Sequence, residues 1–200
     1  ERHRVKPYSE SCDQNRDPIF SIIEPLFRGR RSVLEIGSGT GQHAVHFAAM
    51  MPHLTWHTSD LPENHAGIRA WLDEAALPNI SGPVALDVSS RPWPDLETDA
   101  VFSANTVHIM RWKEVVALFA GVGQLLRRDG LFCLYGPYNY GGNSTSESNA
   151  RFDEWLHARD PLSGIRDFDD LDRLAGTAGL QIEHDYAMPA NNRLLCWRKA

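Results

Sequence analysis

The sequence predicts an α/β fold built on a seven-stranded, mostly parallel sheet with helices on both faces and an antiparallel C-terminal hairpin. Buried apolar runs alternate with segments of helical periodicity along most of the chain, which is typical of a parallel sheet covered by helices. The last two apolar runs are separated by only four residues. A length of 200 residues fits a single domain, 1–200.

The first helix and strand lead into a glycine-rich turn. Asp17 and Pro18 are typical of an N-cap and the first helical position, and the apolar spacing after them predicts a helix that Pro25 should kink or shorten. A short apolar run over 33–36 predicts the first strand. The helix after the turn has apolar residues at positions 44, 47, 48 and 51.

The same alternation continues through the middle of the chain. We expect strands over 54–58, 84–88, 100–104 and 131–135, and helices after residue 64 and over 112–126. Ser144 and Glu147 have the spacing of a capping box, which predicts a helix to about residue 157. Asp167 caps a further helix that Gly179 ends.

The two C-terminal strands form the hairpin. They cover 180–188 and 193–198, and the four residues between them are too few for a parallel crossover. These two strands must therefore pair in antiparallel fashion.

Composition excludes several classes of protein. The net charge of −6 disfavours a protein that wraps duplex nucleic acid. Cys12, Cys133 and Cys196 are odd in number and lack CxxC spacing, which favours reduced thiols in a cytoplasmic protein and no zinc site. The segment 36–59 has no charged residue, but its glycines, proline and histidines are incompatible with a membrane-spanning helix. The histidines between 43 and 65 lack partners at ligand spacing, so we expect no metal.

The strongest chemical signal follows the first strand. Glu35 is followed by Gly37, Gly39 and Gly41, and closely spaced glycines let a backbone turn sharply and approach a ligand at the start of the next helix. In open α/β sheets, ligands bind beyond the carboxyl ends of the strands. The dinucleotide pattern GxGxxG would need glycine where Gln42 stands. The alternative interpretation is a purely structural turn.

Acidic residues follow the next two strands. Asp60 lies 19 residues after Gly41, close to the spacing of the carboxylate that binds ribose hydroxyls in nucleotide sites, with Leu61 beside it. Asp87 ends the predicted third strand, where it or the backbone at Val88 could bind an adenine edge. Each aspartate could instead cap the turn that follows it.

In this order the features resemble those of class I S-adenosylmethionine-dependent methyltransferases. In that superfamily ExGxGxG follows the first strand, acidic residues end the second and often the third, and an antiparallel hairpin completes a Rossmann-like sheet. The C-terminal half is similar to a narrower group, the domain of unknown function 938 family, also called methyltransferase-like 26. The similar strings are Asn105-x-x-His108-Ile, Gly136-Pro137-Tyr138, Gly142-x-x-Thr145-x-x-Ser148-Asn149-x-x-Phe152-Asp153, Gly164-Ile-Arg166-Asp167 and Met188-Pro-Ala-Asn191-Asn192.

This resemblance implies S-adenosylmethionine as cofactor and S-adenosylhomocysteine as product. It implies that 1–30, which the residues alone predict to be a helix leading into the first strand, folds over the cofactor as a lid, and that 136–170 is an insertion on the substrate side. Asn15 and Asn105 are implied cofactor contacts. The chain departs from the family's opening block at 13–14, where Asp-Gln replaces Glu-Arg.

The candidate residues for the methyl acceptor lie beyond strands four and five. His108 could accept a proton or orient the acceptor, and Tyr138 is a second candidate catalytic residue. We expect His108, Tyr138, Asn149 and Asn191 to line one cavity, with Asn192 beside them. Alternatively, the histidine caps a helix or lies hydrogen-bonded in the wall of the site, and the asparagines belong to ordinary turns.

The acceptor class follows from what the chain lacks. Methylation of nucleic-acid amino groups usually depends on an Asn/Asp-Pro-Pro-Tyr-like platform, and the sequence after the fourth strand reads Asn105-Thr-Val-His. We therefore expect in-line methyl transfer to a small molecule, with no nucleic-acid or membrane partner. A cofactor-binding module without transferase activity is one alternative, and a nicotinamide-dependent oxidoreductase is another. The sequence indicates neither the accepting atom nor the oligomeric state.

Overall fold

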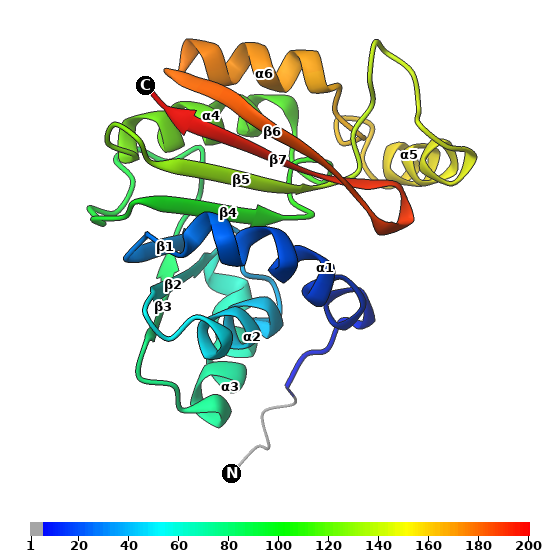
Figure 1. Cartoon of the computed structure of the whole chain (residues 1–200). Helices are drawn as coiled ribbons and strands as arrows, with labels where there is room; N and C mark the ends of the chain where they lie inside the picture. The colour runs from blue at the N-terminus through cyan, green and yellow to red at the C-terminus, as the bar shows by residue number, and fades with distance from the viewer. Residues whose placement is uncertain (1–5) are drawn as a thin grey trace. The chain divides into compact units, whose positions relative to one another are not determined.

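The computed structural model describes residues 6–200 (Figure 1), and the chain divides into two compact units, Glu1–Phe102 and Ser103–Ala200. Its strands form one seven-stranded mixed sheet in the order β3-β2-β1-β4-β5-β7-β6, with helices around it. The boundary between the units falls inside β4 (Ala100–Ala104).

The first unit contains the parallel strands. Its elements are α1 (Glu10–Phe27), β1 (Ser32–Glu35), α2 (Gln42–Met50), β2 (Thr55–Asp60), the 3-10 helix η1 (Pro62–Asn64), α3 (His65–Ala75) and β3 (Ile80–Ala85), followed by the start of β4. Strand β1 pairs with β2 and β4, and β3 pairs with β2. Phe47, Trp56 and Phe102 form a buried aromatic core with ring centroids 5.6–5.9 Å apart. This core fixes α2 against the sheet and thereby positions the turn that precedes the helix.

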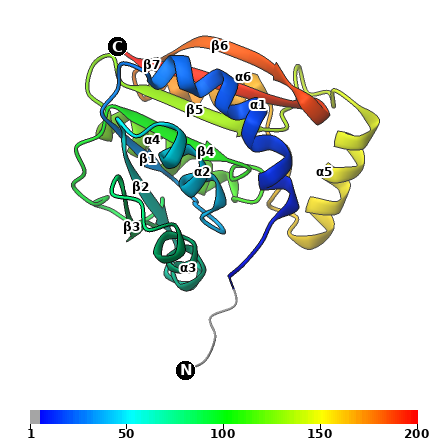
Figure 2. The ribbon, with the colours of Figure 1, turned by 60° about the horizontal axis from the view of Figure 1, so that its bottom comes forward.

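The second unit contains the antiparallel strands. Its elements are α4 (Trp112–Leu125), β5 (Leu131–Gly136), α5 (Glu147–Arg159), α6 (Phe168–Thr177), β6 (Leu180–Met188), the 3-10 helix η2 (Pro189–Asn191) and β7 (Asn192–Lys199). Strand β7 pairs antiparallel with both β5 and β6, and α6 lies against β6 and α4 (Figure 2). Phe119, Phe132 and Trp197 form its aromatic core. Cys133 and Cys196 stand opposite each other on β5 and β7 as free thiols, with their Sγ atoms 3.1 Å apart.

Most of the predicted elements are confirmed. The four apolar runs predicted as β1, β2, β4 and β5 are strands, and the C-terminal pair is an antiparallel hairpin. The N-cap assigned to Asp167 is also confirmed, because its Oδ1 accepts a hydrogen bond of 3.0 Å from the backbone of Asp169.

The predicted start of the first helix is wrong. Helix α1 begins at Glu10 rather than after Asp17, and both Pro18 and Pro25 lie inside it. A proline removes one backbone hydrogen bond and its ring crowds the carbonyl four residues earlier, but packing of the buried face of α1 can offset this cost. Here the start of α1 is held by the side chain of Gln42, whose Oε1 accepts from Ser9 N at 2.6 Å.

The predicted bounds of the third strand are also wrong. Strand β3 covers Ile80–Ala85 rather than 84–88, so Asp87 lies beyond its end. The strand runs through Gly82, where φ is +105° and an added Cβ would lie 2.5 Å from Thr58 Oγ1. A glycine that looks like a strand breaker is therefore required there by close packing against β2.

The capping box predicted for α5 does not form. The helix begins at Glu147, and its N-cap is Ser146, whose Oγ accepts a hydrogen bond from Asn149 N at 3.0 Å. Ser144 lies two residues before this cap. Both serines are compatible with a cap by type, and the path of the loop selects the nearer one.

Candidate functional site

The glycine-rich turn joins β1 to α2 in a conformation that needs its glycines. Gly37, Gly39 and Gly41 have φ angles of 72°, 61° and 93°, in the left-handed region that other residues rarely adopt. A Cβ at Gly41 would lie 3.2 Å from Trp71 Cβ, so this glycine also lets α3 pack closely. A Cβ at Gly39 would meet nothing within 4 Å, so the space above this residue is open.

Asp60 links the end of β2 to this turn. Its carboxylate is buried, with Oδ2 accepting from Gly39 N at 2.8 Å and Oδ1 accepting from Leu61 N at 2.7 Å and from Asn64 Nδ2 at 3.0 Å. The structure thus contains the turn cap that was one interpretation of Asp60. It also places the carboxylate at the glycine turn, as the other interpretation requires. A carboxylate has about four acceptor sites, so capacity for a ligand donor remains.

Glu35 lies beneath the turn and is only 2% exposed. Its Oε1 accepts a hydrogen bond from Trp56 Nε1 at 3.4 Å, and the hydroxyl of Ser38 donates a second one. Burial raises the pKa of the Glu35 carboxyl to about 7, outweighing these hydrogen bonds, and the charge of Asp60 raises it further. Glu35 can therefore exchange a proton near neutral pH.

The N-terminal segment packs onto the helix that follows the turn. Gln42 Nε2 donates to Ser9 O and to Asp13 Oδ1, both at 3.1 Å, and His43 Nε2 lies 2.6 Å from Asn15 Oδ1. Asn15, an implied cofactor contact, is thus held at the first turn of α2. The sequence interpretation missed Gln42 and His43 as residues that fix this segment. The only available signal was a polar pair directly after the glycines.

Asp87 and Val88 lie in a turn after β3. The Asp87 carboxylate is exposed, and its Oδ1 accepts from Ser89 N at 2.9 Å, while Trp93 Nε1 donates to Val88 O at 3.1 Å. This is the turn-capping arrangement considered for Asp87. Its predicted contact with an adenine edge stays a prediction.

In the second unit, His108 is held in the segment between β4 and α4. It is 5% exposed, its ring meets Phe152 of α5 edge-on at 5.3 Å, and its backbone oxygen accepts from Gly164 N at 2.9 Å. Burial lowers the pKa of His108 to about 4, and the nearby charge of Arg166 lowers it further. The buried Nδ1 has no hydrogen-bond partner among the described residues.

Tyr138 and Asn105 both lie near Gly136 at the end of β5. A Cβ added to Gly136 would lie 3.4 Å from Tyr138 Oη and 3.7 Å from Asn105 Oδ1, so the two polar atoms flank this glycine. Tyr138 is fully buried, and burial raises the pKa of its phenol well above the ordinary value. Its hydroxyl has no partner within the described part of the chain, and neither has the buried Oδ1 of the next residue, Asn139. Unsatisfied buried polar atoms are rare and mark positions where a ligand can supply the missing partner.

The three remaining asparagines stabilise loops. Asn149 is buried, and its Nδ2 donates to Thr145 Oγ1 and to Asn191 O, both at 3.1 Å, which joins α5 to the turn of the hairpin. Asn191 has a left-handed φ of 58°, a conformation that asparagine tolerates, and Asn192 Nδ2 donates to Pro189 O at 3.3 Å. The structure therefore joins Asn149 to the backbone of Asn191 through a bond that stabilises the fold, and their predicted place in one acceptor cavity stays a prediction.

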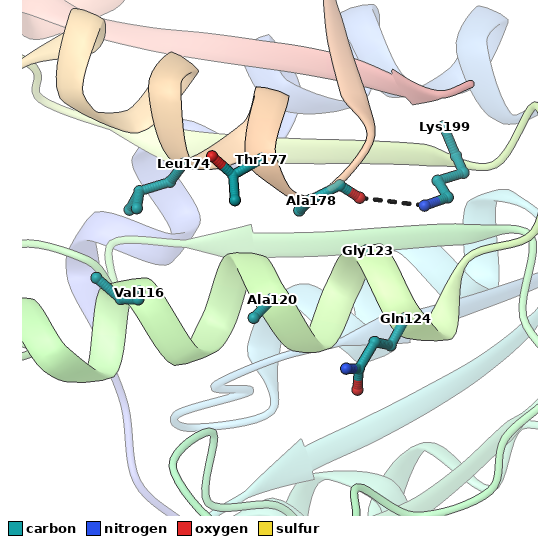
Figure 3. Close-up of a pocket in the computed structure, with 8 residues that line it drawn as sticks. All are labelled: Val116, Ala120, Gly123, Gln124, Leu174, Thr177, Ala178 and Lys199. Carbon is teal, nitrogen blue, oxygen red and sulfur yellow. Dashed lines mark hydrogen bonds between the residues drawn. The ribbon is translucent and has the colours of Figure 1, made fainter.

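A hollow of about 280 Å³ lies between α4 and α6 (Figure 3). Lys199 Nζ donates to Ala178 O at 3.1 Å there and caps the end of α6. The hollow is lined by Val116, Ala120, Gly123, Gln124, Leu174, Thr177, Ala178 and Lys199. None of the residues predicted for cofactor or acceptor is among them.

Residues 6–200 lack two further kinds of feature. No helix in that range is both long and apolar enough to cross a membrane. The same residues contain no group of three or more His, Cys, Asp or Glu side chains that could hold a metal ion.

Comparison with solved structures defines the class of fold, which is that of S-adenosylmethionine-dependent methyltransferases. The apo form of the S-adenosylmethionine-dependent methyltransferase SibL matches with a TM-score of 0.79 and 19% identity, over 94% of this chain and 55% of that one. The mitomycin 7-O-methyltransferase MmcR gives 0.81 and 18%, over 95% and 54%. Human N-acetylserotonin methyltransferase, solved with S-adenosylmethionine, gives 0.79 and 15%, over 96% and 53%. The chain thus spans about half the length of these proteins.

The family that the chain belongs to is narrower than this class of fold. The profile of the protein family of unknown function DUF938 matches residues 6–199, and the chain belongs to this family.

Proposed function

We propose that this protein is an S-adenosylmethionine-dependent methyltransferase of the methyltransferase-like 26 type, acting on a small molecule in the cytoplasm. The observation that carries the proposal is the hydrogen bond from Gly39 N to Asp60, which joins the acidic end of β2 to the glycine turn after β1. A glycine turn and a carboxylate held together at the carboxyl ends of adjacent parallel strands fit a nucleoside with a charged tail.

Each part of the cofactor has a candidate partner in the first unit. The open space above Gly39 leaves room for a ligand against the backbone, and Asp60 would accept hydrogen bonds from ribose hydroxyls. The Glu35 carboxyl would support the turn from beneath, and the turn at Asp87 and Val88 would contact the base. When bound, the cofactor supplies an activated methyl group on a sulfonium.

Gln42 argues against the nicotinamide alternative. The GxGxxG pattern needs glycine at this position. Here the Gln42 side chain makes hydrogen bonds to Ser9 and Asp13, which hold the N-terminal segment.

For the acceptor we propose a neutral, hydrogen-bonding molecule. His108 is uncharged at pH 7, and a base with a pKa near 4 takes up few protons there, so we assign it hydrogen bonding through Nδ1 rather than proton abstraction. The Tyr138 phenol keeps its proton and can donate it in a hydrogen bond. Both atoms lack partners within the described residues, and an acceptor with complementary groups would supply them.

Isothermal titration calorimetry tests the cofactor assignment. Wild-type protein should bind S-adenosylmethionine and S-adenosylhomocysteine and should not respond to NAD. Asp60→Ala should weaken binding of S-adenosylhomocysteine about ten- to a hundredfold, since charged hydrogen bonds are lost. Glu63→Ala is the matched control because it removes a nearby exposed carboxylate from η1. A folded Asp60→Ala variant with wild-type affinity would reduce Asp60 to a turn cap.

A turnover assay separates the enzyme from a binding module. The protein is incubated with S-adenosylmethionine and a library of neutral phenols, thiols and amides, and S-adenosylhomocysteine is quantified. Transferase activity predicts acceptor-dependent product. Tight cofactor binding without product from any acceptor in the library would favour the non-transferring alternative.

A further inference from the structure

The four-residue string Gly164-Ile-Arg166-Asp167 has no role in the function proposed above, yet it contacts several loops of the second unit. Gly164 N donates to His108 O at 2.9 Å, and Ile165 N donates to Asp153 Oδ1 at 2.7 Å. Arg166 O accepts from Asn139 N at 2.9 Å. Through these contacts the string meets the segments that follow both β4 and β5.

Arg166 makes the most specific of these contacts. Its Nε donates to Val107 O at 3.2 Å, and its Nη2 donates to Met110 O and to Leu162 O, the latter at 3.0 Å. Its guanidinium is half-buried and stands 5.6 Å from the ring of Trp112. The side chain therefore binds carbonyl oxygens on both sides of His108.

We propose that Arg166 is the positioning residue for His108. Its planar guanidinium binds the carbonyls that flank this histidine and holds the imidazole where Nδ1 stays without a protein partner, available to the acceptor. A lysine at this position would keep the charge but would lack the fork of donors that spans separate carbonyls. The inference rests on the proposed function for the role of His108, while the positioning itself is independent of it.

Other interactions of His108 agree with this assignment. Gly164 has a φ of +151°, which other residues rarely adopt, and a Cβ there would also lie 2.5 Å from His157 Nε2 and 3.1 Å from Asp153 Oδ1. In this conformation Gly164 N donates to the His108 carbonyl. The positive charge of Arg166 also lowers the pKa of His108, in addition to the larger effect of burial, and keeps the imidazole neutral.

The experiment compares Arg166→Lys and Arg166→Met with wild type in two readouts. The first is amide hydrogen exchange at Gly164, Ile109 and Met110, whose N–H groups bond within or onto the His108 segment. We expect about tenfold or faster exchange in both variants, because charged hydrogen bonds to the segment are lost. The second is the NMR titration of His108, whose pKa should rise above its wild-type value in the methionine variant because the nearby positive charge is removed, while burial still holds it below the ordinary value.

The matched control is Arg173→Met, which removes an exposed arginine from α6 that pairs with Asp170 at 3.0 Å. It should leave exchange and the His108 titration unchanged. Wild-type exchange and titration in both Arg166 variants would overturn the proposal, and so would faster exchange spread evenly over the whole unit. If the methionine variant fails to fold, amide exchange in the lysine variant tests the proposal.

Binding of S-adenosylhomocysteine is measured on the same samples. Its affinity should stay within about twofold of wild type in the Arg166 variants, since Gly39, Asp60 and Asp87, which we propose for the nucleoside, belong to the first unit. If wild-type protein does not bind S-adenosylhomocysteine, the proposed function is refuted. Amide exchange and the NMR titration still test whether Arg166 positions His108. Failure of the proposed function is therefore distinguishable from failure of the positioning role of Arg166.

Discussion

Replacing Glu35 with glutamine should stabilise the protein increasingly as pH rises. Glu35 is 2% exposed, and burial raises the pKa of its carboxyl from 4.5 to about 7. The folded protein therefore keeps this proton at pH values where the unfolded chain has already lost it. Stability from this group falls as pH rises from 4.5 to 7 and is constant above that range, because the folded state binds more protons than the unfolded state.

The magnitude follows from the width of that range. Values of 4.5 and about 7 differ by 2.5 units, and each unit corresponds to about 1.4 kcal/mol. Glutamine is neutral and similar in shape to the protonated side chain. The variant and wild type should thus be nearly equal below pH 4.5, and the variant should be more stable by about 3 kcal/mol above pH 7.

Urea unfolding followed by tryptophan fluorescence measures the free energy of unfolding across this pH range. Glu154→Gln is the matched control, since it removes the same charge from an exposed position on α5. The informative quantity is the slope with pH of the difference between Glu35→Gln and wild type. A difference that is the same at every pH would refute the reasoning that burial keeps this carboxyl protonated.

Two further pairs of variants test local packing. Gly123→Ala should destabilise the protein by about 1–3 kcal/mol, because a Cβ there would lie 2.4 Å from the backbone oxygen of Ala178. Gly176→Ala, with nothing within 4 Å of its Cβ position, should instead stabilise by about 0.5–1 kcal/mol; thermal unfolding of both variants checks this, and equal effects would contradict it. Ser146→Ala should lower stability by about 1 kcal/mol through loss of the α5 cap, whereas Ser144→Ala should have little effect. Urea titrations compare the two, and a larger loss from Ser144→Ala would restore the capping box that the sequence suggested.

Sequence patterns predicted the parts of the fold that local chemistry determines. Apolar runs identified the central strands, and the four-residue connection identified the hairpin. The errors arose where residues distant in the sequence determine the bounds of a helix or strand. Helix α1 begins after Ser9, which Gln42 binds from another helix, and Gly82 stays within β3 because it packs on Thr58. A pattern within one segment carries no information about such partners.

The candidate site also contains some residues that a local pattern identifies and others that depend on distant partners. The glycine turn and Asp60 are recognisable because a ligand-binding turn needs particular residues at fixed spacing. Their hydrogen bond at Gly39 appears in the structure. The role of Arg166 could not be read in this way, because backbone carbonyls have no signature in the sequence.

The string Gly164-Ile-Arg166-Asp167 shows how residues without reactive chemistry can distinguish a family. Asp167 Oδ1 caps α6, and its Oδ2 accepts a hydrogen bond of 2.6 Å from Gly142 N in the loop after β5. Gly164 and Arg166 bind the segment that carries His108. A glycine turn that binds a common cofactor can be shared by many methyltransferases, whereas loops that shape an acceptor site must differ with the acceptor. A string that fixes both loops is therefore expected to be more specific to this family than the glycine turn after β1.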